Sequence, residues 1–394
     1  MLEDLALKIL HLNGELTLRD LSERMHVSLR IVDELFARMR KANLCQVTGM
    51  AGGVHRIVAT SDGRASAIEL LASSQYAGPV PVSLADYVSL VEAQSVRHLK
   101  VDAAAVGRAF EHLVLSDTTV TQLGTALASG RAIFLYGPPG TGKTTVADSM
   151  WRLFETDAVW VPHAIEADGQ IIEVFDPGVH RPVEQPDSHD HDERWVLCQR
   201  PRVMVGGELT IEMLDLQYSP ASKHYTAPVQ MKASNGLLII DDFGRQRVRP
   251  DELLNRWVVP LDRHIDFLTL VGGRKIEIPF DMLVVFATNL DPSQLVDDAF
   301  LRRIQTKIRL DAVSPADFHE IFRRVCRDVE LEYQPAMVDH LMETITRDFG
   351  QELRPCFPRD IVHLVCSTAR YRQEKPRLDD ESLGLACGAY FVVR

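Results

Sequence analysis

An apolar segment followed directly by a glycine-rich loop is the feature of this sequence that most restricts its fold. Residues 132–136 read Ala-Ile-Phe-Leu-Tyr, and residues 137–144 match the pattern G-x-x-x-x-G-K-[ST]. Such a loop connects a strand to a helix, because its glycines let backbone N–H groups fold around an anion while the helix start adds a positive dipole end. We therefore expect a phosphate-binding loop after a buried strand, rather than a merely tight turn.

The side chains of this loop have separate expected roles. Lys143 is predicted to reach the β and γ phosphates of a nucleotide, and Thr144 is predicted to ligate Mg²⁺. The cofactors that follow from the motif are ATP and Mg²⁺. The residues expected to bind the nucleotide are Gly137, Pro138, Pro139, Gly140, Thr141, Gly142, Lys143, Thr144 and Thr145.

A second apolar run ends in two carboxylates. Residues 236–240 read Gly-Leu-Leu-Ile-Ile, and Asp241 and Asp242 follow them. This pattern is typical of a buried strand that carries acidic groups to a nucleotide. We predict that Asp241 holds Mg²⁺ through its water shell and that Asp242 polarises the attacking water.

Three further segments follow in an informative order. Residues 282–288 form an apolar run that ends before Asn289, residues 298–304 contain Arg302 and Arg303, and residues 357–361 contain Arg359. A lone arginine is usually a solvated charge or an ion-pair partner. Here the succession of loop, carboxylates, asparagine and arginines favours a role at phosphate oxygens, which suit the planar guanidinium.

These five elements, between about residues 110 and 375, resemble those of AAA+ ATPases. The resemblance implies that Asn289 is the sensor 1 residue, that Arg359 is sensor 2, and that Arg303 reaches a neighbouring subunit as an arginine finger while Arg302 pairs locally. It also implies a ring of six subunits. Most AAA+ proteins carry Glu where this chain has Asp242, so the catalytic carboxylate is shorter here.

The same resemblance places His163 at the end of the second core strand, over residues 160–163. In many AAA+ proteins a polar residue there restrains the catalytic carboxylate. A histidine that is simply satisfied within the core is an equally good interpretation. If Asp242 were not the base, Glu208 would be the next candidate.

A predicted helix at residues 253–257 and a hairpin over residues 267–278, turned at Gly272 and Gly273, precede the sensor 1 strand. A hairpin at this place, with a long insertion before the acidic strand, is similar to MoxR-type ATPases and to bacterial enhancer-binding activators. The insertion lacks the G-A-F-T-G-A loop of the activators. We therefore favour the MoxR-like interpretation.

The first 75 residues resemble a winged-helix domain. Helices are expected at residues 3–12 and 18–25 and after Ser28, followed by strands at 45–48 and 54–60. We predict an α/β fold, a P-loop NTPase parallel sheet with an α-helical lid, preceded by a winged helix-turn-helix domain. The expected boundaries are 1–75 for the winged helix, 76–109 for a connection, 110–310 for the nucleotide-binding domain and 311–394 for the lid.

Charge and composition restrict the partners. The net charge of -12 argues against a protein whose whole surface grips nucleic acid, and residues 1–75 carry equal numbers of basic and acidic side chains. The leading hypothesis is an ATP-driven machine that remodels a protein partner in a homo-oligomeric ring; the alternative is a regulator that binds DNA through the winged helix. No apolar run is long enough to span a bilayer, so we expect no membrane insertion and a cytoplasmic location.

Two remaining features concern metal and thiol chemistry. The six cysteines are scattered, so buried reduced thiols are expected rather than a disulfide framework. Residues 170–202, with the run Asp-Ser-His-Asp-His-Asp-Glu at 187–193, are expected to form an exposed insertion. A solvated charged loop is favoured there over a metal site.

Overall fold

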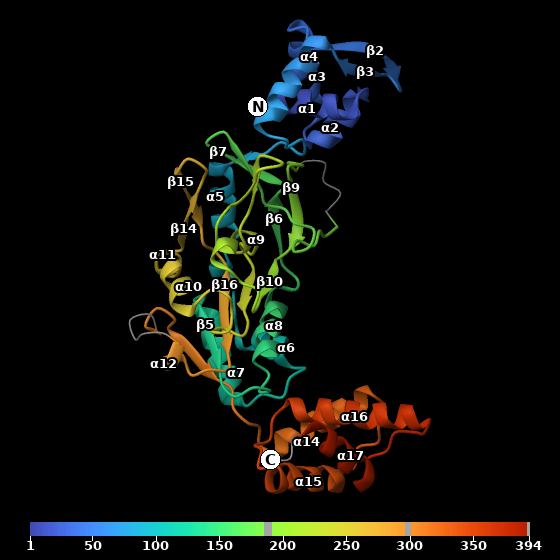
Figure 1. Cartoon of the computed structure of the whole chain (residues 1–394), viewed down its shortest axis with the longest axis vertical. Coiled ribbons are helices and arrows are strands. Elements are labelled where there is room, and N and C mark those ends of the chain that lie inside the picture. The colour runs from blue at the N-terminus through green and yellow to red at the C-terminus, as the bar shows by residue number, and fades with distance from the viewer. Residues whose placement is uncertain (185–190, 296–300, 392–394) are drawn as a thin grey trace.

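The computed structural model describes residues 1–184, 191–295 and 301–391. The chain is elongated, with the N-terminal helices and strands β2 and β3 at one end, the C-terminal helices at the other and the remaining labelled strands between them (Figure 1). Among the described residues, no helix has the length and apolar character needed to cross a membrane.

The N-terminal elements form where the sequence predicts them. Thr17 caps the second helix, since its hydroxyl accepts from the Asp20 N–H while the Asp20 carboxylate accepts from the Thr17 N–H at 2.8 Å. A small antiparallel sheet in the order β1-β3-β2 completes this unit. Its elements are α1 (Leu2–Asn13), β1 (Leu16–Thr17), α2 (Leu18–Met25), α3 (Leu29–Lys41), β2 (Cys45–Ala51), β3 (Val54–Ala59) and α4 (Ser61–Ser73).

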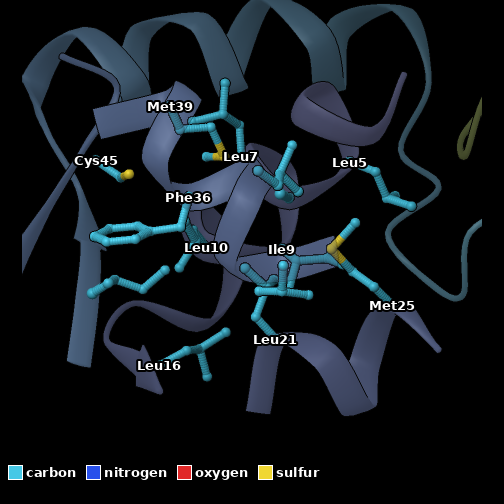
Figure 2. Packing of buried hydrophobic residues seen from close by; sticks show 14 of the residues in the cluster. Leu5, Leu7, Ile9, Leu10, Leu16, Leu21, Met25, Phe36, Met39 and Cys45 are labelled. Atoms are coloured by element: carbon cyan, nitrogen blue, oxygen red, sulfur yellow. The ribbon is translucent and has the colours of Figure 1, made fainter. Parts of the chain in front are cut away.

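The N-terminal unit has its own apolar core, shown in Figure 2, where leucine, isoleucine and methionine side chains meet between the helices. This core extends into the following segment, because Tyr76, Val80 and Ala164 belong to the same buried cluster. The Val80 N–H also donates to the Met25 carbonyl at 2.8 Å. The start of the expected connection at residues 76–109 is therefore packed against the N-terminal unit.

A five-stranded parallel sheet forms the centre of the molecule, in the order β10-β13-β16-β5-β17. The three middle strands carry almost only buried apolar side chains, as strands covered on both faces do. The expected parallel α/β sheet is thus confirmed. Its strands are β10 (Arg202–Val205), β13 (Leu237–Ile240), β16 (Leu283–Thr288), β5 (Ile133–Tyr136) and β17 (Thr306–Arg309).

Helices surround this sheet. One core of buried side chains lies between the sheet and helices α6 (Ala103–Phe110), α7 (Asp117–Ser129) and α8 (Lys143–Ser149). Another contains side chains from α10 (Pro250–Arg256) and α11 (Val258–Arg263), centred on the fully buried Trp257. Short 3-10 turns, at Val96–His98, Met150–Phe154 and Ile211–Leu214, connect the larger elements.

A second sheet, in the order β11-β12-β8-β7-β4, lies between the central sheet and the N-terminal unit. It forms a core with α5 (Leu84–Ala93), with the pair β6 (Ala158–Pro162) and β9 (Trp195–Gln199), and with the hairpin β14 (Ile265–Thr269) and β15 (Lys275–Pro279). The hairpin turns at Gly272 and Gly273, as the sequence predicts. The strands of the sheet are β11 (Gln217–Ser219), β12 (His224–Thr226), β8 (Gln170–Glu173), β7 (Ala164–Ala167) and β4 (Val82–Ser83), and α9 (Val229–Lys232) follows β12.

The expectation of an exposed insertion at residues 170–202 was therefore wrong for most of its length. β8 and β9 lie within this range, and His180 is buried, with its Nε2 2.9 Å from the Lys232 carbonyl oxygen. Both strands are short, and the prolines and charged residues between them concealed them in the sequence. Part of the acidic run at residues 187–193 lies outside the described residues, and no His, Cys, Asp and Glu cluster suited to a metal occurs among those described.

The C-terminal segment is helical and has a separate core. Phe318, Phe322 and Ile361 are among its fully buried side chains. Its helices are α14 (Pro315–Asp328), α15 (Pro335–Glu343), which continues into a π-type turn, α16 (Cys356–Arg372) and α17 (Asp380–Tyr390). The short α12 (Pro292–Leu295) precedes β17. Of the six cysteines, all free, four are buried and two are half-buried.

Candidate nucleotide-binding site

The glycine-rich loop follows β5 and leads directly into α8. Gly137, Gly140 and Gly142 all have positive φ, at 142°, 80° and 85°, which residues with side chains rarely adopt. A Cβ on Gly137 would collide with the Leu310 carbonyl oxygen, and one on Gly140 would lie 2.7 Å from the Cys356 sulfur. At Gly137 and Gly140, a side chain is therefore disfavoured both by the backbone conformation and by steric overlap with neighbouring atoms.

Lys143 lies against the loop itself. Its ammonium group donates to the Gly137 and Pro138 carbonyl oxygens, at 3.0 and 2.7 Å, and reaches the Thr141 hydroxyl at 3.4 Å. Burial lowers the pKa of Lys143, and Asp241 and Asp242 act in the opposite direction by favouring the charged form. The ammonium group is therefore held by the loop carbonyls, within the electrostatic influence of Asp241 and Asp242.

The acidic residues after β13 meet the loop. The Thr144 hydroxyl donates to Asp241, with its oxygen 3.1 Å from Oδ1 and 2.9 Å from Oδ2. A hydroxyl and a carboxylate are the oxygen ligands that Mg²⁺ takes beside nucleotide phosphates. This donor set fits the expected metal, with Thr144 and Asp241 as the residues that would hold it.

Asp242 and Asn289 come together from adjacent strands. The Asn289 amide donates to the Asp242 carboxylate at 3.3 Å. Asp242 has φ 49°, and its N–H donates to the Asp241 carboxylate at 3.0 Å. The left-handed backbone turns the chain sharply after β13, and Phe243 then bonds to the Ala287 carbonyl oxygen. The two expected catalytic side chains therefore point into one place at the carboxyl edge of the sheet.

The loop, Asp241, Asp242 and Asn289 all line one cavity of about 900 Å³. It lies between the loop, the carboxyl ends of β13 and β16, and the C-terminal helices. Arg359 lines it from α16, where its side chain is 65% exposed and pairs with Asp360 at 3.1 Å. The lining residues that the sequence predicted are Pro139, Gly140, Thr141, Gly142, Lys143, Thr144, Thr145, Asp241, Asp242, Asn289 and Arg359.

Sequence reasoning missed a second arginine at the loop. Arg354 lies just before α16, with its Cδ 3.5 Å from where a Cβ on Gly140 would be. Its guanidinium covers the ring of Phe357 and bonds to Gln351 at 3.2 Å, while its Nε is buried without a hydrogen-bond partner. A buried unpaired donor is costly unless a ligand satisfies it. Nothing in the local sequence distinguishes Arg354 from Arg359.

The expected position of His163 was wrong. The strand before it, β6, pairs antiparallel with β9 outside the central sheet, and β10 lies beside β13 instead. The residue that follows the true neighbouring strand is Glu208, whose carboxylate accepts from the Gly206 N–H at 3.0 Å. His163 contacts the N-terminal unit, with its ring centroid 4.5 Å from that of His26. A restraint of Asp242 by His163 is therefore excluded by position.

Arg302 and Arg303 lie at the opposite edge of the sheet from the loop. They precede β17, whose first residue, Thr306, is level with the start of β5, whereas the loop follows the end of β5. Arg303 donates to Asp262 at 3.0 Å, and Arg302 is exposed. The beginning of the predicted helix around them lies outside the described residues. Neither arginine lines the cavity around the loop of its own chain.

Comparison with family models gives one match, to a domain of unknown function (DUF8689) over residues 314–389. This covers the C-terminal helices alone. No curated protein matches the sequence.

Among solved structures, the chain is similar to a K64R mutant of RuvB from Thermotoga maritima, with 14% identity, a TM-score of 0.43, and 70% of this chain and 69% of that chain covered. It is also similar to domain III of the replication initiation protein DnaA from the same organism, with 15% identity and a TM-score of 0.41, covering 72% of this chain and 96% of that one. The chain's own parallel sheet, with its loop after β5 and carboxylates after β13, is that of a P-loop NTPase fold.

Proposed function

We propose that this chain is a Mg²⁺-dependent AAA+ ATPase that works in a homo-oligomeric ring, by family resemblance a hexamer, and remodels a protein partner. The observation that carries the proposal is the convergence of Lys143, Thr144, Asp241, Asp242 and Asn289 on one cavity. Bound ATP supplies the phosphoryl group that is transferred to water. The chain itself supplies the groups that bind and orient the phosphates and that accept the proton of the attacking water.

Each side chain has a separate task. The loop N–H groups and Lys143 bind and orient the phosphates, and Thr144 and Asp241 hold the metal. Asp242 accepts a proton from the attacking water, and Asn289, 3.3 Å from it, fixes the orientation of its carboxylate. Arg359 lines the cavity from the helical side, and Arg354 lies against the loop at Gly140, where the positive charge of both arginines would attract the phosphates.

The proposal is tested by phosphate release from the purified chain with ATP and Mg²⁺. Lys143→Ala should abolish tight ATP binding in calorimetry, because the loop loses its side-chain cation. Unchanged affinity in this variant would remove the site assignment. A hydrolysis-deficient Asp242→Asn chain, loaded with ATP, should then retain its protein partner in a pull-down.

The position of the N-terminal unit favours a protein partner over DNA. We interpret this unit as a winged helix, in which α3 would read the major groove with its amino-terminal end. Ser28 and Ile31 at that end line a cleft whose other wall contains Asp86, Glu166 and Glu193. Carboxylates that face the amino-terminal end of α3 would repel the phosphates of a bound duplex. Two of the basic residues of α3 are also paired, Arg30 with Glu34 and Arg38 with Glu3.

A gel shift of the whole chain at low salt separates the two functions. If neither specific nor random duplex is retained, the DNA regulator is excluded. Retention that falls steeply with salt would favour the regulator.

A further inference from the structure

The cleft between α3 and the second sheet has the properties of a peptide site. It has a volume of about 580 Å³, within the range of sites that enclose a few side chains. One wall comes from α1 and α3, and the other comes from α5, β7 and the residues before β9. We propose that this cleft docks a basic segment of the protein partner, anchored by an apolar side chain. This inference rests on the proposed function.

The N-terminal wall of the cleft is apolar and accessible. Leu2 and Ile31 are 36% and 42% exposed, although both are large apolar side chains. Val27, Val80 and Pro81 continue this surface as buried residues beneath it. Apolar side chains grouped in a concave surface gain free energy when a partner removes them from water.

The facing wall is acidic. Asp86, Glu166 and Glu193 line the cleft, and none of them forms an ion pair within the part of the chain that the structure describes. Arg194 is the cation of this wall, but Asp192 holds it by a bidentate pair, with the closest contact at 2.6 Å. Arg194 also attracts Asp86, but one arginine faces four carboxylates once Asp192 is included, so the wall carries net negative charge beside an apolar surface.

This combination selects the occupant. Lysine or arginine side chains of a partner would meet the three carboxylates, while one leucine-sized side chain would cover Leu2 and Ile31. An acidic peptide and a nucleic acid backbone are both repelled by the same carboxylates. Charge complementarity thus points to a segment that is both basic and apolar.

The two walls are fixed relative to each other. The His26 ring nitrogen Nδ1 lies 2.9 Å from the Glu193 carbonyl oxygen, and the His26 ring packs on His163 from the core. The Gln75 N–H donates to the Ser222 carbonyl at 2.8 Å at another point of contact between the units. A site whose walls are already fixed loses less conformational entropy when it binds a peptide.

The test is fluorescence polarisation with a labelled Lys-Arg-Leu-Lys-Arg-Leu peptide on the chain of residues 1–394, without nucleotide. Glu193→Lys and Ile31→Ser should each weaken binding roughly fivefold or more. Glu69→Lys, an equal charge change on the exposed face of α4, is the matched control and should change the affinity less than about twofold. A peptide with both leucines replaced by serine should bind more weakly to the wild-type chain.

Several outcomes would overturn the proposal. No binding of the leucine peptide to the wild-type chain would do so, as would equal losses in Glu69→Lys and Glu193→Lys or equal binding of the serine peptide. If a short DNA duplex displaces the labelled peptide from this cleft, the occupant is nucleic acid and the peptide proposal is wrong. Phosphate release is measured separately for each variant, so that a chain that binds the peptide but does not hydrolyse ATP contradicts the proposed function and leaves the cleft assignment intact.

Discussion

The Thr144 hydroxyl bonds to both carboxylate oxygens of Asp241, although the two residues are 97 positions apart in the chain. The contact exists because β13 and β5 end at the same edge of one parallel sheet, with β16 between them. It brings together the two oxygen-bearing side chains that we propose as Mg²⁺ ligands. The metal requirement of the chain should therefore depend on this pair.

Removing the Thr144 hydroxyl should raise the Mg²⁺ concentration needed for ATP hydrolysis. Thr144→Val keeps the shape of the side chain but loses an oxygen ligand, so that we expect about a tenfold higher half-saturating Mg²⁺ concentration. The measurement is phosphate release across a Mg²⁺ titration. Thr121→Val, on the exposed side of α7, is the control. Equal Mg²⁺ curves for Thr144→Val and wild type would show that the hydroxyl is not a ligand.

Asp242 should separate binding from hydrolysis. Asp242→Asn keeps the size of the side chain and its contact to Asn289 but cannot accept a proton, so that ATP should bind with unchanged affinity while turnover falls about 100-fold or more. Asp242→Glu should keep or raise turnover. Calorimetry and phosphate release together report both effects. If Asp242→Asn hydrolyses ATP normally, another carboxylate is the base, and Glu208, after β10, becomes the residue to test.

Arg354 should matter for nucleotide affinity more than its sequence context indicates. Its buried, unpartnered Nε lies by the loop, whereas Arg359 is exposed and pairs with Asp360. Losing a charge-assisted hydrogen bond costs about 1.5–3 kcal/mol, so that Arg354→Ala should weaken ATP binding about tenfold or more. Arg347→Ala is the control, because Arg347 is another exposed arginine in the C-terminal helices, paired with Asp348. ATP affinity equal to wild type in Arg354→Ala would exclude this role.

The sequence predicts the parts of the site that are local in the chain. A glycine-rich loop after an apolar run has essentially one geometry, and the carboxylates at the end of a buried strand must emerge at the sheet edge. Lys143, Asp241 and Asn289 were therefore identifiable before their contacts were known. The N-terminal helices and the Gly272–Gly273 hairpin were predicted for the same reason, from local sequence patterns and turn glycines.

Long-range strand pairing is where prediction from the sequence failed. Residues 158–162 are as apolar as a core strand, yet they pair antiparallel with β9, and the weaker pattern at 202–205 joins the sheet instead. Periodicity states which face of a strand is buried but not which strand lies beside it. His163 was misplaced for this reason. Arg354 was missed because burial of one guanidinium nitrogen depends on tertiary packing.

His163 should make the stability of the chain fall in mild acid. Burial, and then the nearby His26, lower its pKa to about 4 from a usual value of 6.5. The unfolded chain therefore takes up this proton at a higher pH than the folded chain, and stability present above pH 6.5 is lost progressively towards pH 4.

The measurement is the thermal unfolding midpoint between about pH 7.5 and pH 4.5, roughly the range in which the folded and unfolded states differ in the number of bound protons. His163→Phe keeps an aromatic ring between His26 and Phe175 but removes the titrating group. Its midpoint should fall less steeply with pH than that of wild type. His55→Phe, at an exposed position of β3, is the control. Parallel curves for wild type and His163→Phe would contradict the assignment.

Assembly should be required for full activity, because the arginines before β17 lie at the far edge of the sheet from their own loop. The transferring phosphoryl group gains much from an added cation, and a neighbouring subunit in a ring can deliver one. Arg303 is the expected finger. In the single chain it is held by Asp262, at 3.0 Å, so that a neighbour's phosphates would have to compete with that carboxylate.

Mixing two inactive variants tests the shared site. Arg303→Ala subunits lack the finger, and Lys143→Ala subunits lack the loop cation, so that an interface with Lys143 from one subunit and Arg303 from the next is complete in a mixed ring. Such mixtures should recover part of the phosphate-release rate, while each variant alone stays inactive. Arg263→Ala, at an exposed position on the nearby α11, is the control for a general loss of charge. Two outcomes would show that each chain completes its own site: mixtures that stay inactive although both variants assemble, or dilute monomers that hydrolyse ATP at the full rate. Loss of activity in Arg302→Ala instead of Arg303→Ala would assign the finger to Arg302.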